Sequence, residues 1–312
     1  MPRLNLRQLL IFTAVADAGS TVAAADRVSL SQSATSAALK ELEQLLGSPL
    51  FDRVGRRLRL NETGRALLPQ ARALLDGATA IEREFDAEAA GVGSGGPARL
   101  RVGASTTIGN YLLPTLIARY RLSSPATQLD VRIGNTSEVS ALVGRFEVDV
   151  GLIEGPCRES GVLAEAWMQD PLVILCAAHH PLLRGRKKRV ASIDDLRRET
   201  WLLREPGSGT REIVEQTLIP MLHPLREGTQ FGSTEAIKRA AAEGLGLTCL
   251  SFYAAEDQIA LGRLVPLRTR LPRLTRQLYL IHHEAKVLTP NLTRFIQHCR
   301  SAGKAQRAPS QR

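Results

Sequence analysis

The segment Ser20–Arg53, STVAAADRVSLSQSATSAALKELEQLLGSPLFDR, decides how the first part of the chain folds. It begins with a predicted short helix whose small apolar face is formed by Ala24, Ala25 and Val28. Ser29-Leu30-Ser31 interrupts that helix, and either serine can cap the next one, with Ser29 and Gln32 spaced as a capping box. Two helices joined by such a tight turn predict a helix-turn-helix.

The second helix of this segment has two faces of different composition. Spacings of three and four predict a buried face made of Ala34, Ala38, Leu42 and Leu45. Small polar residues and one lysine occupy another face, and such side chains can donate to or accept from base edges in the major groove of DNA. We therefore expect DNA contacts from Ser31, Gln32, Ser33, Thr35, Ser36 and Lys40.

The flanking segments complete a predicted DNA-binding domain. Residues 6–18 predict a first helix that packs on the helix-turn-helix through Leu6, Leu9, Leu10, Thr13 and Ala16. After a helix end at Gly47, residues 50–60 alternate around a glycine turn, as a two-stranded wing does. We expect Arg53, Arg56 and Arg57 on this wing to reach phosphates or the minor groove, which positions the domain without specifying sequence.

Residues 61–90 predict one long helix, with a kink at Pro69. Its apolar residues step by four and three, which is a heptad seam of Leu67, Ala71, Leu74, Ala78, Ile81 and Phe85. A seam of this length favours a partner helix, although packing on its own domain is the alternative. The glycine-rich residues 91–97 predict a flexible hinge, so the helix ends in a linker and dimerisation is preferred.

Strands and helices alternate beyond Pro97, which predicts βαβ units, a mostly parallel sheet and two similar α/β halves around a cleft. The predicted strands are 99–103, 128–133, 149–153, 173–177, 201–203, 247–251 and 277–282. The predicted helices are 111–121, 137–145, 210–221, 234–243 and 291–300. Residues 304–312 are expected to form a frayed tail.

Composition and charge narrow the class of protein. The 312 residues carry a net charge of +10, yet residues 1–90 hold eleven basic and eleven acidic side chains, so net charge supports nucleic-acid binding only weakly. A second basic cluster at 184–189 is expected to be a solvated loop.

We expect no membrane span and no signal peptide. The four cysteines match no metal spacing, which indicates reduced thiols and a cytoplasmic location.

Three loops rich in hydroxyl groups follow predicted strands of the α/β region, where ligands of such folds bind. Hydroxyls and free N–H groups at helix starts favour an anion, although helix capping alone is the alternative for any one residue. We expect a small oxyanion or carboxylate, for example sulfate, sulfite or an organic acid. The expected ligand-binding residues are Ser105, Thr106, Thr107, Asn135, Thr136, Ser208 and Thr210.

Enzymatic sites are not indicated by the sequence. His179-His180 and His282-His283 have no carboxylate at metal-ligand spacing, and the glycines around Ser208 do not match a nucleophile elbow. We expect no catalytic residue, no metal and no cofactor. A solute-binding protein, or an enzyme that uses the cleft, are the alternative functions; the first would require export, which the lack of a signal peptide disfavours.

The segment 20–65 resembles the winged helix-turn-helix of LysR-type transcriptional regulators. The residues that carry the resemblance include Ser31-Gln32-Ser33, Leu46-Gly47, Leu50-Phe51 and Thr63-Gly64, with Asn61 where the family often has Thr. The resemblance extends over nearly the whole chain, and 203–212 and 232–238 look like members that control sulfur assimilation or carbon fixation.

The resemblance implies a ligand-responsive regulator built from a DNA-binding domain (1–61), a linker helix (62–90), a hinge (91–97), a two-lobed effector domain like periplasmic binding proteins (98–303) and a tail (304–312). Such regulators pair through their linker helices, form homotetramers and usually activate a metabolic operon. The expected partners are double-stranded DNA, a small anionic effector, further copies of the chain and RNA polymerase, with no membrane. The effector, the operator, the sign of regulation and the choice between dimer and tetramer are left open.

Overall fold

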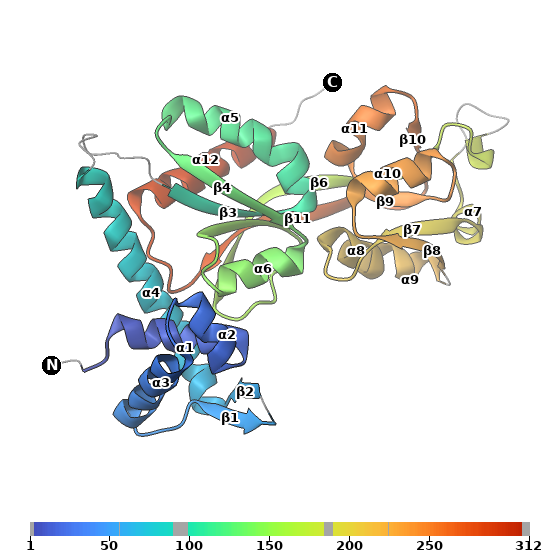
Figure 1. The fold of residues 1–312 in the computed structure, drawn as a ribbon. Coiled ribbons are helices and arrows are strands. Elements are labelled where there is room, and N and C mark those ends of the chain that lie inside the picture. Colours follow the sequence, from blue (N-terminus) through green and yellow to red (C-terminus); the bar gives the residue numbers. More distant parts are fainter. Residues whose placement is uncertain (1–2, 56, 90–98, 184–189, 224, 308–312) are drawn as a thin grey trace. The chain divides into compact units, whose positions relative to one another are not determined.

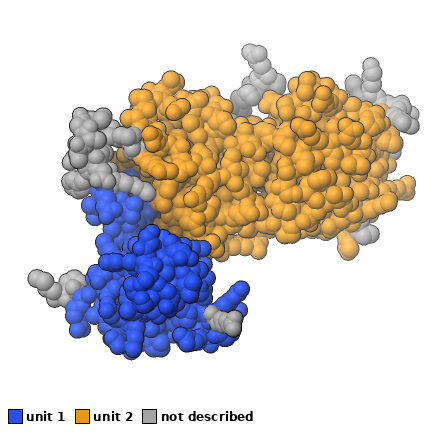
Figure 2. Space-filling model, viewed as in Figure 1, with its two compact units in different colours: residues 1–96, 285–289 blue, residues 97–284, 290–312 orange. Residues whose placement is uncertain are grey.

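The computed structural model describes residues 3–55, 57–89, 99–183, 190–223 and 225–307, with the backbone alone for 83–89 and 305–307. The chain divides into two compact units (Figure 2). The first comprises Met1–Gly96 and Ala285–Thr289, and the second comprises Pro97–Glu284 and Pro290–Arg312. The predicted hinge and the basic cluster 184–189 lie outside the described residues.

The first unit contains a winged helix-turn-helix and a long helix (Figure 1). Its elements are α1 (Leu6–Ala18), α2 (Thr21–Arg27), α3 (Gln32–Leu46), β1 (Phe51–Val54), β2 (Arg57–Leu60) and α4 (Glu62–Ala89). Ser31 is the N-cap of α3 and its side chain accepts the N–H of Ala34. Ser29 instead has a φ of 54° and forms the turn, so the predicted capping box of Ser29 and Gln32 is wrong.

The inward faces of α1 and α3 differ from those predicted. Leu9 and Thr13 of α1 are buried as expected, but Leu6 and Leu10 are both 47% exposed, and the additional buried residues are Ile11, Phe12 and Val15. On α3 the buried residues are Thr35, Leu39 and Leu42, while Ala34 is exposed. The core of the unit thus takes Ile11, Phe12 and Val15 from α1 and Leu39 and Leu42 from α3, and burial of these side chains removes apolar surface from water.

The heptad seam of α4 divides into two parts. Leu67 and Ala71 pack into the core of the first unit, together with residues of α1 and α3. Leu74 and Ile81, further along the same seam, are 55% and 60% exposed. The side chain of Phe85 lies outside the described residues. The start of the seam therefore serves its own domain, and its later part presents apolar side chains to solvent.

A segment distant in sequence joins the first unit. Residues Ala285–Thr289 belong to this unit although they lie between two elements of the second. Lys286 Nζ is 2.8 and 2.7 Å from the two carboxylate oxygens of Asp76 on α4, and both side chains are buried. This ion pair ties the returning segment to α4.

The second unit is a two-lobed α/β domain (Figure 1). Its strands are β3 (Arg99–Ser105), β4 (Gln128–Gly134), β5 (Val150–Glu154), β6 (Val162–Ala177), β7 (Thr200–Arg204), β8 (Arg226–Phe231), β9 (Thr248–Ser251), β10 (Leu264–Pro266) and β11 (Leu274–His283). Its α-helices are α5 (Leu113–Ser123), α6 (Thr136–Gly144), α7 (Ile193–Arg198), α8 (Gly209–Ile213), α9 (Ile219–Leu222), α10 (Thr234–Ala242), α11 (Phe252–Ala260) and α12 (Pro290–Arg307). Short π-helical turns, η1 (Ile108–Leu112) and η3 (Val214–Leu218), lead into α5 and α9.

The larger sheet of the described residues has the order β10-β6-β11-β5-β3-β4, with β9 also paired to β6. Here β3 pairs in parallel with β4 and β5, as predicted, whereas β11 and β6 pair antiparallel with their neighbours. The prediction of a mostly parallel sheet is therefore wrong for this sheet. A parallel pair requires a crossover connection, and β11 instead returns from the second lobe in the opposite direction to β5.

The strands β6 and β11 run through both lobes, as Figure 1 shows. In the first lobe β11 pairs with β5, and in the second lobe β6 pairs with β9 and β10. Each lobe has its own core, with Tyr120 and Phe295 in the first and Trp201 and Leu218 in the second. The two lobes, and the loops between them, are therefore connected by two strands that belong to both lobes.

Other sequence expectations have mixed outcomes. The helix α12 continues to Arg307, so the frayed tail does not begin at residue 304. All four cysteines are free thiols. Among the described residues no helix has the length and apolar character needed to cross a bilayer, and no group of three or more metal-ligating side chains is found.

Candidate functional site

The polar face of α3 lies on the surface of the first unit. Gln32, Ser33, Ser36 and Lys40 are all exposed. The Gln32 Nε2 donates to Thr21 Oγ1 of α2 at 3.3 Å, and the Ser31 and Ser33 hydroxyls lie 3.0 Å apart. Both amide and hydroxyl groups can exchange these contacts for base edges, so this face has the chemistry that major-groove recognition requires.

Thr35 lies apart from the other residues expected to contact DNA. Its side chain is fully buried, and its hydroxyl donates to the Ser31 carbonyl oxygen at 3.0 Å. It follows Ser31 by four residues, and on α3 this position faces the core formed with Leu39 and Leu42. The expectation of a DNA contact from Thr35 is corrected: Thr35 supports the helix from its inward side.

The wing arginines are exposed on a short antiparallel pair of strands. Arg53 of β1 lies opposite Leu58, and Arg57 of β2 lies opposite Val54, with Gly55 in the left-handed region between the strands. Arg56 lies outside the described residues. Cations at the tip of a two-stranded wing can reach phosphates beside the groove that a recognition helix enters.

Three of the predicted ligand-binding residues converge on one carboxylate of the chain itself. Ser105 Oγ and the Thr107 N–H donate to Glu154 Oε1 at 2.9 and 2.8 Å. Thr210 Oγ1 donates to Glu154 Oε2 at 3.3 Å. We call these donors, together with Arg276 Nη1 at 2.5 Å from Glu154 Oε2, the hydroxyl cradle. In the structure these donors therefore bond to a carboxylate of the chain itself.

Arg276 on β11 connects this cradle to a second buried carboxylate. Its Nη2 is 2.6 Å from Asp170 Oδ2 on β6, and Ser251 donates to the other oxygen of Asp170 at 2.6 Å. Burial opposes ionisation of Glu154, but Arg276 and the cradle hydrogen bonds outweigh it and hold its pKa below the ordinary value. Burial prevails at Asp170 and raises its pKa. One guanidinium is therefore shared by two carboxylates.

The side chains of Thr106, Asn135 and Thr136 have partners within the chain. Thr106 Oγ1 donates to the Gly134 carbonyl oxygen at 3.1 Å and accepts from Arg204 Nη2 at 3.5 Å. Asn135 and Glu138 form a capping box at the start of α6. Thr136 Oγ1 donates to the Glu154 carbonyl oxygen at 2.9 Å. Asn135 therefore caps a helix, which is the alternative to ligand binding that the sequence left open.

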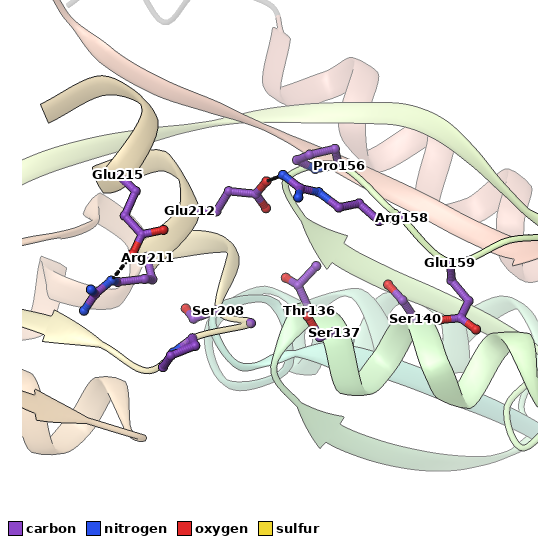
Figure 3. Close-up of a pocket in the computed structure, with 12 residues that line it drawn as sticks. Thr136, Ser137, Ser140, Pro156, Arg158, Glu159, Ser208, Arg211, Glu212 and Glu215 are labelled. Carbon is purple, nitrogen blue, oxygen red and sulfur yellow. Dashed lines mark hydrogen bonds and ion pairs between the residues drawn. The ribbon is translucent and has the colours of Figure 1, made fainter. Parts of the chain in front are cut away.

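A cavity of about 350 Å³ lies between the two lobes (Figure 3). Hydroxyl side chains line it from both sides: Thr136, Ser137, Ser140 and Ser208. Two arginines and three glutamates also line it: Arg158, Arg211, Glu159, Glu212 and Glu215. Figure 3 shows Arg158 and Glu212 pointing toward one another, and Arg211 turned to Glu215. In each pair the nitrogen–oxygen distance is 2.5 Å. Of the residues predicted for ligand binding, Thr136 and Ser208 line this cavity.

The charged residues of this region were not predicted from the sequence. Glu154 is the last residue of β5 and follows the apolar residues VGLI. An acidic residue at the end of an apolar strand is the one local feature that could have indicated a functional role for Glu154. Arg276 and Asp170 lie on strands far apart in sequence, and only their pairing register brings them together. Arg158 and Arg211 resemble ordinary surface arginines, because nothing local distinguishes them from the others.

Comparison with sequence families agrees with this architecture. The family described as "Bacterial regulatory helix-turn-helix protein, lysR family" matches residues 6–65. The family described as "LysR substrate binding domain" matches residues 93–304.

Named relatives cover nearly the whole chain. The uncharacterized HTH-type transcriptional regulator YeiE of Escherichia coli (strain K12) is 44% identical over 95% of this chain and 97% of its own length. The RuBisCO operon transcriptional regulator of Allochromatium vinosum is 33% identical, covering 95% and 99%, in line with the predicted subgroup.

Among solved structures, a full-length variant of OxyR from Pseudomonas aeruginosa matches with a TM-score of 0.71 and 25% identity, covering 96% of each chain. The Synechocystis PCC6803 CcmR regulatory domain in complex with 2-PG matches with a TM-score of 0.60 and 27% identity, covering 66% of this chain and 98% of that one. The relatives are regulators and not enzymes. The chain therefore belongs to the LysR family, as a transcriptional regulator with a helix-turn-helix DNA-binding domain and an effector-binding domain.

Proposed function

We propose that this regulator activates a metabolic operon when a small anionic effector occupies the cavity between its two lobes. The observation that carries the proposal is the convergence of Arg158 and Arg211 on one cavity, from the loop after β5 and from α8. Guanidinium groups bind carboxylates and oxyanions through paired, charge-assisted hydrogen bonds. The hydroxyls of Ser137, Ser140 and Ser208 supply further donors.

The glutamates of the cavity refine the expected ligand. Arg158 is bonded to Glu212 and Arg211 to Glu215, so an entering anion would replace a glutamate as the arginine's partner. The displaced glutamates would then favour hydroxyl or amino groups elsewhere on the ligand. A small organic acid with such donors fits this lining better than a bare inorganic ion. The complex of the CcmR regulatory domain with 2-PG supports a small ligand in this type of domain.

The proposal predicts that either cavity arginine contributes to effector affinity. Calorimetric titration of the full chain with organic acids, sulfate and sulfite is expected to identify an anionic ligand. Arg158→Ala and Arg211→Ala should each weaken its binding about tenfold or more, because a charge-assisted hydrogen bond is lost. Arg145→Ala, which removes an exposed arginine outside the cavity, is the control and should leave affinity unchanged. Binding of uncharged molecules alone would contradict the proposal.

The direction of regulation requires a separate experiment. The relative named for the RuBisCO operon supports control of a metabolic operon. Transcription with purified RNA polymerase, from the promoter beside the chain's own gene, should rise when both regulator and effector are present. A fall in transcript on adding effector would show repression and overturn the activating role.

The candidate DNA contacts belong to the same proposal. They are the exposed residues of α3 and of the wing, namely Ser31, Gln32, Ser33, Ser36, Lys40, Arg53 and Arg57. The later part of the α4 seam is proposed as the surface through which two copies pair.

A further inference from the structure

The hydroxyl cradle has the composition of an anion-binding site. Its donors come from β3 and the turn after it, from α8 and from β11, and their side chains are at most 2% exposed. Ser105, Thr107, Thr210 and Arg276 place two hydroxyls, one backbone N–H and one guanidinium around a single carboxylate. Both oxygens of Glu154 thereby accept hydrogen bonds, and one of them also forms an ion pair with Arg276.

The cradle adjoins the cavity of the proposed function. Thr136 lines the cavity and donates to the carbonyl of Glu154. Gly209 lies so close to that carbonyl that an added Cβ would come within 2.0 Å of its oxygen. The backbone of Glu154 thus contacts the wall of the cavity, while its side chain fills the cradle behind it.

The cradle has no unpaired positive charge that a free anion could bind, because Arg276 already pairs with two carboxylates. Arg276 is its only guanidinium among the described contacts, and it is shared with Asp170, which is fully buried. A second anion would also meet the Glu154 carboxylate at close range, where like charges repel strongly in a water-poor interior.

We propose that Glu154 is a tethered anion that occupies a built-in carboxylate site and so excludes free anions from it. Glu154 thereby acts as a specificity-determining residue: it confines the effector to the adjoining cavity. The inference rests on the proposed function for the identity of that cavity, whereas the existence of the carboxylate site is independent of it.

The test is chemical rescue of Glu154→Ala in the full chain. The substitution removes Cγ and the carboxyl group, and acetate has the same atoms. Acetate should therefore raise the melting temperature of the variant by several degrees, since a ligand that binds only the folded state stabilises it. Sodium chloride at equal ionic strength, and neutral acetamide, should give a markedly smaller rise. Acetate should also raise the melting temperature of Glu154→Ala by more than it raises that of wild type.

Glu165→Ala is the matched control, because Glu165 also pairs with an arginine, Arg300, but on the surface. An equal acetate response in Glu154→Ala, Glu165→Ala and wild type would overturn the inference. A Glu154→Ala protein that stays insoluble at every acetate concentration would overturn it too. Glu154→Gln fills the same space, so it should fold and show no acetate-specific stabilisation; an acetate rescue as large as that of alanine would contradict the inference.

The outcomes separate the two proposals. If Arg158→Ala weakens effector binding but acetate rescues nothing, only the tethered anion fails. If acetate rescues Glu154→Ala while no anion binds wild type, only the effector proposal fails.

Discussion

Individual side chains on α3 and the wing divide between two tasks in the proposed DNA complex. Gln32 and Ser36 are exposed on the face of a recognition helix, where hydrogen bonds to base edges would specify sequence. Arg53 is exposed on the wing, where a phosphate contact would add affinity for any sequence. Thr35 is buried, so it contacts neither bases nor phosphates in this proposal.

Substitutions should separate these roles in binding assays on operator and random DNA at several salt concentrations. Gln32→Ala and Ser36→Ala are expected to reduce discrimination between the two DNAs by about 1–3 kcal/mol each at a contacted base. Arg53→Ala should weaken binding to both DNAs equally and reduce the salt slope by about 1.

Thr35→Val is the control, since it removes a buried hydroxyl that bonds to Ser31. It should lower the stability of the protein by about 1 kcal/mol and leave both specificity and salt slope unchanged. If all four variants lose affinity for both DNAs to the same extent, the assigned roles are wrong.

At the scale of elements, α4 combines two functions along one helix. Its first turns complete the core of the helix-turn-helix through Leu67 and Ala71. Its later turns expose Leu74 and Ile81 on the same heptad seam, and apolar residues at this spacing are typical of a paired helix. The sequence predicts the seam, while burial shows which part is used within the unit.

A charged residue in the exposed part of the seam should therefore disrupt pairing. Leu74→Asp combined with Ile81→Asp is expected to convert the oligomer to a smaller species in light scattering coupled to gel filtration. Burial of each such side chain contributes about 1.5–3 kcal/mol, so the loss should be large. Ala80→Asp introduces one such charge beside the seam and should keep the oligomer. An unchanged mass for the double variant would exclude this surface.

For the molecule as a whole, segments far apart in sequence complete each unit. The returning segment Ala285–Thr289 brings Lys286 to the buried carboxylate of Asp76. Similarly, Arg276 joins Glu154 and Asp170 within the second unit. Buried ion pairs are costly to break, because the charge that is left has lost its compensation from water.

Lys286→Met should consequently lower the free energy of unfolding by about 3–5 kcal/mol, measured by urea denaturation with a probe in the first unit. Adding Asp76→Asn to Lys286→Met should recover part of this loss, because no charge then stays buried at the pair. Arg99→Met removes an exposed partner of Asp130 and should cost at most about 1 kcal/mol. If Lys286→Met and Arg99→Met lower the free energy of unfolding equally, the buried pair contributes no more to stability than the exposed one.

Local patterns in the sequence determined the winged helix-turn-helix, the long helix and the two-lobed α/β class, because caps, periodicity and turn residues act over a few positions. They also indicated loops suited to an anion. Tertiary structure decided which anion those loops contact: strand register brings Glu154 and Arg276 together across 122 positions of sequence. It likewise decided the antiparallel return of β11 and the burial of Thr35, since both depend on packing between elements that no local pattern encodes.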